Sequence, residues 1–184
     1  MRDIIDKIGN CTLQTSPDYY SSLVRTIISQ QLSNKASNTI FARLLKKVND
    51  ELNPENVLNL SNFQLKSAGI SKQKMSYLRD LSTKFLNMEI DTSTFPSLDD
   101  EEAITLLTSI RGIGKWSAQM ILIYCLNRPN ILPLDDLGFR NSLKLNYNLS
   151  HSPNKDLIIK ISKKWEPYRS IAVWYLWQSI NQNG

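Results

Sequence analysis

The chain has 184 residues, of which 41% are hydrophobic, and this suits one compact domain or two small lobes that bury a sizeable core. A formal net charge of +5 is compatible with a polyanionic partner such as nucleic acid, although lysine and arginine also serve solubility. No apolar run approaches the length of a membrane span, and charged residues interrupt the N-terminal stretch, which is unlike a secretion signal. We therefore expect a protein that is not secreted and works inside the cell, in the cytoplasm or nucleoid, or in a eukaryotic nucleus.

Cysteine and histidine are scarce. Cys11, Cys125 and His151 are the only residues of these two types, so the clustered ligands of a zinc or iron–sulfur site are missing from the sequence. A Ser-His or Cys-His nucleophile would depend on His151, which lies in a stretch flanked by serine and proline. Chemistry must therefore rest on carboxylates, amides, aromatic side chains and the backbone.

Apolar residues recur with the period of a helix along most of the chain, and no stretch alternates as a strand would. We therefore predict an all-α protein of roughly ten short helices. The first covers residues 1–9. Ser16 and Pro17 predict the start of the second, whose inward stripe is Tyr20, Leu23, Val24, Ile27 and Ile28. Ser33, Asn53 and Ser61 are predicted to cap the next three helices.

A glycine turn at Gly69 precedes a long helix, whose lysines are expected on a solvated face, with phosphate contact as the alternative. Ser97 and Asp100 match a capping box before the next helix. Residues 153–165 predict a further helix, with Leu157, Ile158, Ile161 and Trp165 inward. Pro167 is predicted to start the last helix, which is apolar on all sides from 171 to 177 and therefore buried.

Between two apolar runs, the stretch from Leu106 to Leu122 contains a Gly-Ile-Gly turn. The two glycines permit a sharp turn and remove the Cβ atoms that would keep a bulky ligand away. A helix starts at the turn, so the N–H groups of Gly112, Gly114 and Lys115 should point outward and suit an anion, most simply a phosphate. An ordinary tight turn is the alternative.

Three other groups of residues have two interpretations each. Gln30 and Gln31 lie between two predicted helices and either form a solvated, capping junction or insert into a ligand. In the stretch LPLDDLGFR, Asp136 is either an N-cap or a carboxylate aimed into a cleft, and one residue can do both. Trp165 and Trp174 suit core packing, which is also the simplest explanation of Trp177.

Four stretches occur together in order: LVRTIISQQLSNKAS, AGISKQKMSYLRDLS, RGIGKWSAQMIL with LPLDDLGFR, and WEPYRSIAVWYLW. Over about residues 17 to 180 they resemble the helix-hairpin-helix DNA glycosylases of the 3-methyladenine DNA glycosylase II type. The chain resembles their catalytic core, without the extra N-terminal β-domain of some bacterial relatives. The resemblance implies one domain over 1–184, built as two small helical lobes with a cleft between them. Lobe one would cover about 17–125, and lobe two the N-terminal helix with about 126–184.

The resemblance also implies roles for individual residues. Gly112, Gly114 and Lys115 would hold the DNA backbone beside the lesion, and the hairpin carbonyls are a candidate site for a monovalent cation. Asp136 matches the catalytic aspartate, whereas Asp135 is its less constrained neighbour. Gln31 falls where relatives insert a wedge into the gap left by the flipped nucleotide. Trp116 and Trp177 match positions that line the base pocket.

The implied reaction is hydrolysis of the N-glycosidic bond of alkylated purines, of the 3-methyladenine and 7-methylguanine type, in double-stranded DNA. Bifunctional relatives have a Schiff-base lysine where this chain has Trp116, so we expect a monofunctional enzyme that leaves an abasic site. The segment 141–184 has no cysteine, so the four-cysteine iron–sulfur cluster of endonuclease III-like relatives is not expected. No cofactor should be required, and we expect a monomer. The alternatives are another lesion (hypoxanthine, oxidised guanine or uracil) or a non-catalytic helix-hairpin-helix DNA-binding module.

Overall fold

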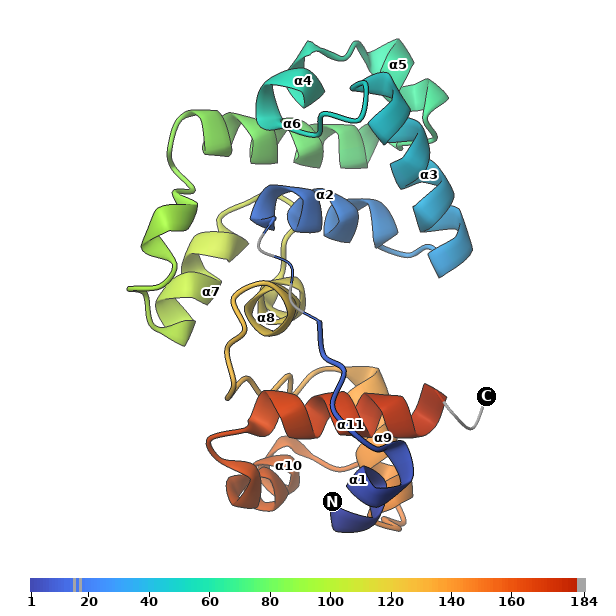
Figure 1. Cartoon of the computed structure of the whole chain (residues 1–184), viewed down its shortest axis with the longest axis vertical. Coiled ribbons are helices and arrows are strands. Elements are labelled where there is room, and N and C mark those ends of the chain that lie inside the picture. The colour runs from blue at the N-terminus through green and yellow to red at the C-terminus, as the bar shows by residue number, and fades with distance from the viewer. Residues whose placement is uncertain (15, 17, 182–184) are drawn as a thin grey trace. The chain divides into compact units, whose positions relative to one another are not determined.

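The structure, a computed structural model, describes residues 1–14, 16 and 18–181. Over these residues it contains only helices, which confirms the all-α prediction (Figure 1). The α-helices are α1 (Arg2–Ile8), α2 (Tyr19–Ser29), α3 (Asn34–Lys47), α4 (Pro54–Asn59), α5 (Asn62–Ser67), α6 (Lys72–Leu86), α7 (Asp100–Thr108), α8 (Lys115–Tyr124), α9 (Leu137–Asn146), α10 (Lys155–Ser162) and α11 (Arg169–Asn181). Two short 3₁₀ helices are η1 (Thr92–Thr94) and η2 (Lys163–Trp165). None of the described helices is long and apolar enough to cross a membrane.

The chain divides into two compact units. The central unit is Ser16–Ile121, and the terminal unit combines Met1–Thr15 with Leu122–Gly184. The division falls inside α8, so this helix begins in the central unit and ends in the terminal unit.

In the central unit, α2 packs against α3 and α6, and α6 also packs against α4. All five residues of the predicted α2 stripe are buried, which confirms the period read from the sequence. The helix starts at Tyr19, and the Asp18 carboxylate accepts the Ser21 N–H at 2.9 Å. Ser16 is therefore not the cap, and Pro17 lies outside the described residues.

Side-chain caps start most helices of the central unit. Ser33, Asn53 and Ser61 each accept a backbone N–H from the first turn that follows, as predicted. The capping box predicted at Ser97 and Asp100 is wrong, because Asp99 caps α7 and pairs reciprocally with Glu102. Ser97 instead donates its hydroxyl to the carbonyl of Thr94, just before α7. The first turn of α7 is consequently acidic, with Asp100, Glu101 and Glu102 in succession.

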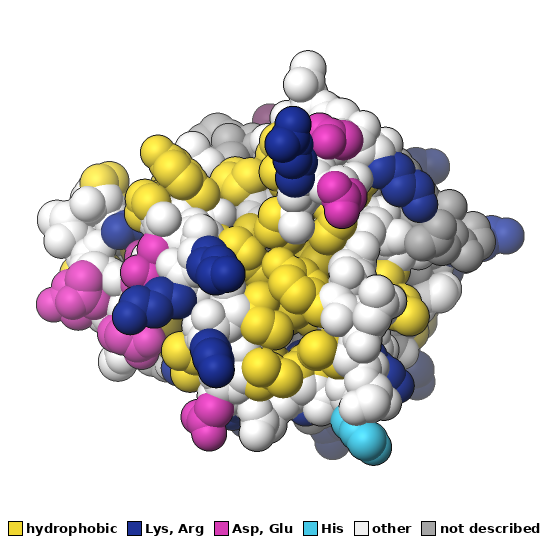
Figure 2. Space-filling view, turned by 90° about the horizontal axis from the view of Figure 1, so that it is seen from below, with side chains coloured by type: hydrophobic (Ala, Val, Ile, Leu, Met, Phe, Trp, Pro, Cys, Tyr) yellow, Lys and Arg dark blue, Asp and Glu magenta, His cyan; other side chains and the backbone are white. Residues whose placement is uncertain are grey.

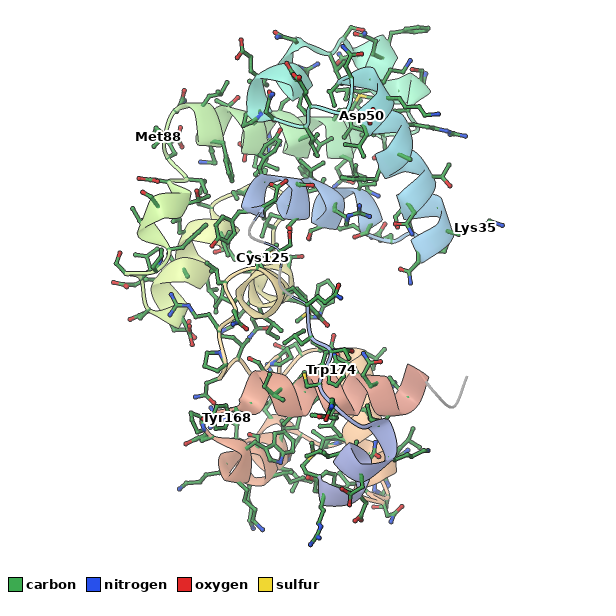
Figure 3. All side chains as sticks on the ribbon, in the orientation of Figure 1. Lys35, Asp50, Met88, Cys125, Tyr168 and Trp174 are labelled. Carbon is green, nitrogen blue, oxygen red and sulfur yellow. The ribbon has the colours of Figure 1, made fainter. Side chains whose placement is uncertain are left out.

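In the terminal unit, α11 packs against α1 and α9. Its middle is buried, as predicted, and Trp174, labelled in Figure 3, is 6% exposed. Trp165 also belongs to this core, at 9% exposed. The last helix begins at Arg169, where the Ala172 N–H donates to the Tyr168 carbonyl at 3.1 Å, so the predicted start at Pro167 is two residues early.

The helix predicted over 153–165 is shorter than expected. It ends at Ser162, and η2 carries the chain on to Trp165. Ile158 is buried, but Leu157 is 37% exposed, so its predicted inward position is wrong. Ile5 and Ile159 are exposed as well. Figure 2 shows a face on which apolar side chains reach the surface among lysine and arginine side chains.

Candidate functional site

The Gly-Ile-Gly turn of the central unit uses its two glycines for different reasons. Gly112 has a φ of +86°, and a Cβ added there would lie 2.3 Å from a ring carbon of Tyr77. A Cβ added at Gly114 would meet nothing within 4 Å. The prediction that both glycines clear space for a ligand is therefore wrong for Gly112, whose missing side chain admits the Tyr77 ring. Only Gly114 faces open space.

The helix after the turn starts without a side-chain cap from its preceding residue. The Gly114 carbonyl accepts the Ala118 N–H at 2.9 Å, which opens α8, but Gly114 has no side chain that could satisfy the following N–H groups. Lys115 is exposed in the first turn. An exposed helix start with a cation beside it suits a phosphate, so the anion-site prediction is consistent with this geometry.

Two polar side chains hold the turn in place. The Asp80 carboxylate accepts the backbone N–H of Arg111 at 2.8 Å. The Gln30 side-chain amide donates to the Gly112 carbonyl at 2.7 Å. Gln30 is therefore engaged with the turn and is not part of a solvated junction. Its amide uses one of the two lone pairs of the Gly112 carbonyl oxygen.

Gln31, the predicted wedge, follows directly and is exposed, with a φ of +57°. It borders a hollow of about 410 Å³ in the central unit, together with Gln30, Gln73, Lys74, Tyr77, Gly112, Trp116 and Ser117. Trp116, a predicted base-pocket residue, is 48% exposed. The structure thus brings Gln31, Gly112 and Trp116 together around one hollow.

The terminal unit holds the candidate catalytic carboxylate. Asp136 is the N-cap of α9 and is 9% exposed. One oxygen, Oδ1, accepts the Phe139 N–H at 2.5 Å and the indole N–H of Trp177 at 2.9 Å. Asp135, by contrast, is exposed and pairs with the Lys155 ammonium at 2.7 Å. Of the two neighbouring carboxylates, Asp136 is therefore the buried one, and Asp135 is the exposed one.

Aromatic side chains stand beside this carboxylate. The ring of Tyr124 stacks on Trp177 with centroids 6.2 Å apart and planes 14° from parallel. Burial, and then the negative charge of Asp136, raise the pKa of the Tyr124 hydroxyl above its usual value. A Cβ added at Gly138 would lie 3.4 Å from Asp136 Oδ1, in ordinary van der Waals contact, so Gly138 lies directly against the carboxylate. Trp177 thus has a polar contact as well as a packing role.

Sequence reasoning missed several residues that shape these places. Lys74 was expected on a solvated face, but its ammonium donates to the carbonyls of Ile28 and Gln30, so that prediction is wrong for this lysine. Tyr77, Asp80 and Tyr124 also went unnoticed. Their partners lie between 31 and 53 residues away in the chain, and no local pattern signals such contacts.

The sequence is similar to a family of DNA repair proteins and to individual DNA glycosylases. The family model described as HhH-GPD superfamily base excision DNA repair protein matches residues 24–167. The chain is 35% identical to DNA-3-methyladenine glycosylase 1 of Schizosaccharomyces pombe over 163 residues, which cover 87% of the chain and 72% of that protein. A relative in Bacillus subtilis is 34% identical over 88% of the chain, but the chain spans only 58% of its length.

A solved structure extends the similarity to three dimensions. The 3-methyladenine DNA glycosylase of S. pombe in complex with abasic DNA matches with a TM-score of 0.86 and 32% identity. The match covers 98% of this chain and 90% of the other.

Proposed function

The chain belongs to the HhH-GPD superfamily of base excision DNA repair proteins, and on that premise we propose that it is a monofunctional DNA glycosylase. Its substrate would be an alkylated purine of the 3-methyladenine or 7-methylguanine type in duplex DNA. The product would be the free base and an abasic site. The observation that carries the proposal is Asp136, a buried carboxylate held by two N–H donors in a chain of this family.

Asp136 supplies the chemistry in this proposal. Departure of the base leaves oxocarbenium character on the sugar, which a carboxylate in a water-poor site stabilises electrostatically. The same carboxylate can orient or deprotonate the attacking water. Because the N–H groups of Phe139 and Trp177 both donate to Oδ1, they fix the orientation in which the carboxylate would act. A base alkylated at N3 or N7 is cationic and leaves readily, so a separate acid is not needed.

Aromatic rings would recognise the base. An electron-poor cationic purine is attracted to indole faces by stacking and cation–π contact, worth roughly 0.5 to 2 kcal/mol for each ring. We assign this contact to Trp116 and Trp177, whose indoles are both accessible in part. Tyr124, stacked on Trp177, would hold that indole in place.

DNA binding would use the glycine turn and the residue beside it. Gly114 and Lys115 would contact a phosphate at the start of α8, and Gln31 would fill the gap left by the flipped nucleotide. By the resemblance, Trp116 would take the place of the lysine with which bifunctional relatives form a Schiff base, so strand cleavage is not expected. The proposal requires no cofactor, and it places a monomeric protein in the compartment that holds DNA. A monovalent cation at the hairpin carbonyls stays a proposal.

The decisive experiment uses 5′-labelled duplexes that each carry one lesion: 7-methylguanine, 3-methyladenine, hypoxanthine, 8-oxoguanine or uracil. After incubation, one half of each sample is treated with alkali, which cleaves at abasic sites. We expect alkali-dependent cleavage at the methylated purines and none without alkali. Excision of only a non-alkylated base would transfer the function to that lesion, and no release from any duplex would leave a DNA-binding module. Borohydride trapping on DNA would contradict the monofunctional assignment.

A further inference from the structure

Lys74 makes contacts unusual for a lysine in the first turn of a helix. Its ammonium lies against the end of α2 and donates to the carbonyls of Ile28 at 2.7 Å and of Gln30 at 2.8 Å. Carbonyls at the end of a helix have no partner within the helix, and a cation there also meets the negative end of the helix dipole. Burial lowers the pKa of Lys74. Lys72, two residues earlier on the same helix, is exposed.

The Gln30 carbonyl belongs to the middle peptide of a tight turn. The Leu32 N–H donates to the Ser29 carbonyl at 3.1 Å and closes a four-residue turn. Gln30 has φ −51° and ψ 126°, and Gln31 has φ +57°. These angles are those of a type II turn, in which the third residue takes a positive φ and is usually glycine or asparagine. A glutamine at this position is held in a conformation that it does not favour by itself.

Types I and II differ by a flip of the peptide between the two middle residues. In the type I turn this carbonyl points the other way, and the third residue takes an ordinary negative φ. The peptide in question here is Gln30–Gln31, and its carbonyl is the one that accepts the Lys74 ammonium. The Lys74 contact therefore favours the type II orientation, and with it the left-handed conformation of Gln31.

The same residue also reaches the glycine turn. The Gln30 side-chain amide donates to the Gly112 carbonyl at 2.7 Å, while its backbone carbonyl accepts from Lys74. Gln30 is thus held at both ends, and Gln31 projects from a turn tied to the hairpin. All of these residues belong to the central unit.

We propose that Lys74 is a positioning residue for the wedge: its ammonium holds the Gln30–Gln31 peptide in the type II orientation from which Gln31 enters the duplex. The proposal rests on the proposed function in so far as Gln31 acts on DNA. Lys74 then acts through Gln31 and needs no phosphate of its own. Removing its ammonium lets the peptide flip, Gln31 relaxes to negative φ, and its side chain leaves the inserting position.

The test compares Lys74→Met with Lys72→Met, which removes the same charge from an exposed position in the same turn, and with Lys74→Arg, which restores donors. Each variant binds a duplex with a tetrahydrofuran abasic analogue and 2-aminopurine opposite it. The fluorescence rise of unstacked 2-aminopurine then reports wedge insertion without catalysis. We expect Lys74→Met to lose at least about half of the rise, Lys72→Met to keep it, and Lys74→Arg to regain most of it.

A double-mutant cycle with Gln31→Ala tests the route of the effect. If Lys74 acts through Gln31, Lys74→Met changes neither the fluorescence nor the single-turnover excision rate further in the Gln31→Ala background. Additive losses would overturn the proposal. It is equally overturned if Lys74→Met matches Lys72→Met in fluorescence, or only flattens the salt dependence of binding by about one unit, as a phosphate contact would.

Two further outcomes are distinguishable. If the wild type excises no base, the proposed function fails, while the fluorescence comparison still decides the role of Lys74. If the wild type gives no fluorescence rise, Gln31 is no wedge and the proposal on Lys74 fails. Should Lys74→Met not fold, Lys74→Gln replaces it, because its amide can reach one of the two carbonyls, and a partial loss is expected.

Discussion

Two helices that begin at predicted site residues start in opposite ways. α8 follows Gly114, which has no side chain and faces open space, whereas α9 follows Asp136, whose carboxylate accepts a first-turn N–H. Both helix starts favour negative charge for the same electrostatic reason. In the first the charge has to come from outside, and in the second the chain supplies it. One helix start is thus suited to recruit a phosphate, and the other to hold a carboxylate in a fixed orientation.

Replacing Asp136 by asparagine should keep the helix cap at the start of α9 but remove its negative charge. We expect the largest loss of excision rate from this variant. Asparagine caps helices about as well as aspartate, so the free energy of unfolding should change by less than about 0.5 kcal/mol. Loss of the negative charge should lower single-turnover excision by at least 10²- to 10³-fold, on the order found for electrostatic catalysis. Asp135→Asn is the matched control, since that exposed carboxylate pairs with Lys155 at the surface. A greater loss from the control would move the assignment by one residue.

A carboxylate placed at position 114 should cap the start of α8 as Asp136 caps the start of α9, and should thereby make it a poorer phosphate site. In Gly114→Asp the new Cβ meets nothing within 4 Å, so the protein should fold and gain a few tenths of a kcal/mol from capping. Affinity for duplex DNA should fall about 10- to 100-fold, or roughly 1.4 to 2.8 kcal/mol, because the carboxylate repels a phosphate. Gly114→Ala adds the Cβ without the charge and should lose much less. Equal affinities for wild type and Gly114→Asp, measured by fluorescence anisotropy, would place the phosphate elsewhere.

Trp177→Phe keeps an aromatic ring for the stack on Tyr124 but removes the N–H that Asp136 accepts. A hydrogen bond to a charged group contributes about 1.5 to 3 kcal/mol, and Phe139 still holds the same oxygen. We expect about a tenfold lower excision rate and a lower thermal unfolding midpoint, measured by single-turnover kinetics and calorimetry. An unchanged rate would show that the indole N–H does not orient the carboxylate.

The smallest effect is expected at Lys115. Lys115→Ala should weaken binding only a few-fold at moderate salt and equally for damaged and undamaged duplexes. The slope of log affinity against log salt should become shallower by about one unit, since one fewer counterion is released. Lys164→Ala removes an exposed lysine of the terminal unit and serves as the control. A loss confined to damaged DNA would contradict a plain phosphate contact.

Local patterns in the sequence predicted what depends on neighbours along the chain. The stripe of α2 and the caps Ser33, Asn53 and Ser61 follow from periodicity and side-chain chemistry within one or two turns. The local pattern did not decide between two neighbouring side chains that can both cap a helix. Ser97 and Asp99 both suit the N-cap of α7, and the helix uses Asp99, whose backbone N–H also donates to the Glu102 side chain.

Long-range contacts could not be read in this way. The need for glycine at 112 is set by the ring of Tyr77, and the role of Lys74 by carbonyls 44 and 46 residues earlier. The sequence therefore indicated the residues of the turn but not the partners that hold it. The roles of Asp136, Gln31 and the two site tryptophans stay predictions until the variants are measured.

The acidic first turn of α7 has a consequence for how the protein meets DNA. Residues 88–106 contain six acidic residues and no lysine or arginine, so the rest of the chain carries +11, against +5 for the whole. When negative charge is concentrated in one segment of an otherwise positive protein, the field of a polyanion rotates the protein as the two approach. A duplex should therefore be repelled from α7 at the first encounter, and most collisions should be oriented before any side chain touches a base. Raising the salt concentration would remove this guidance and slow association.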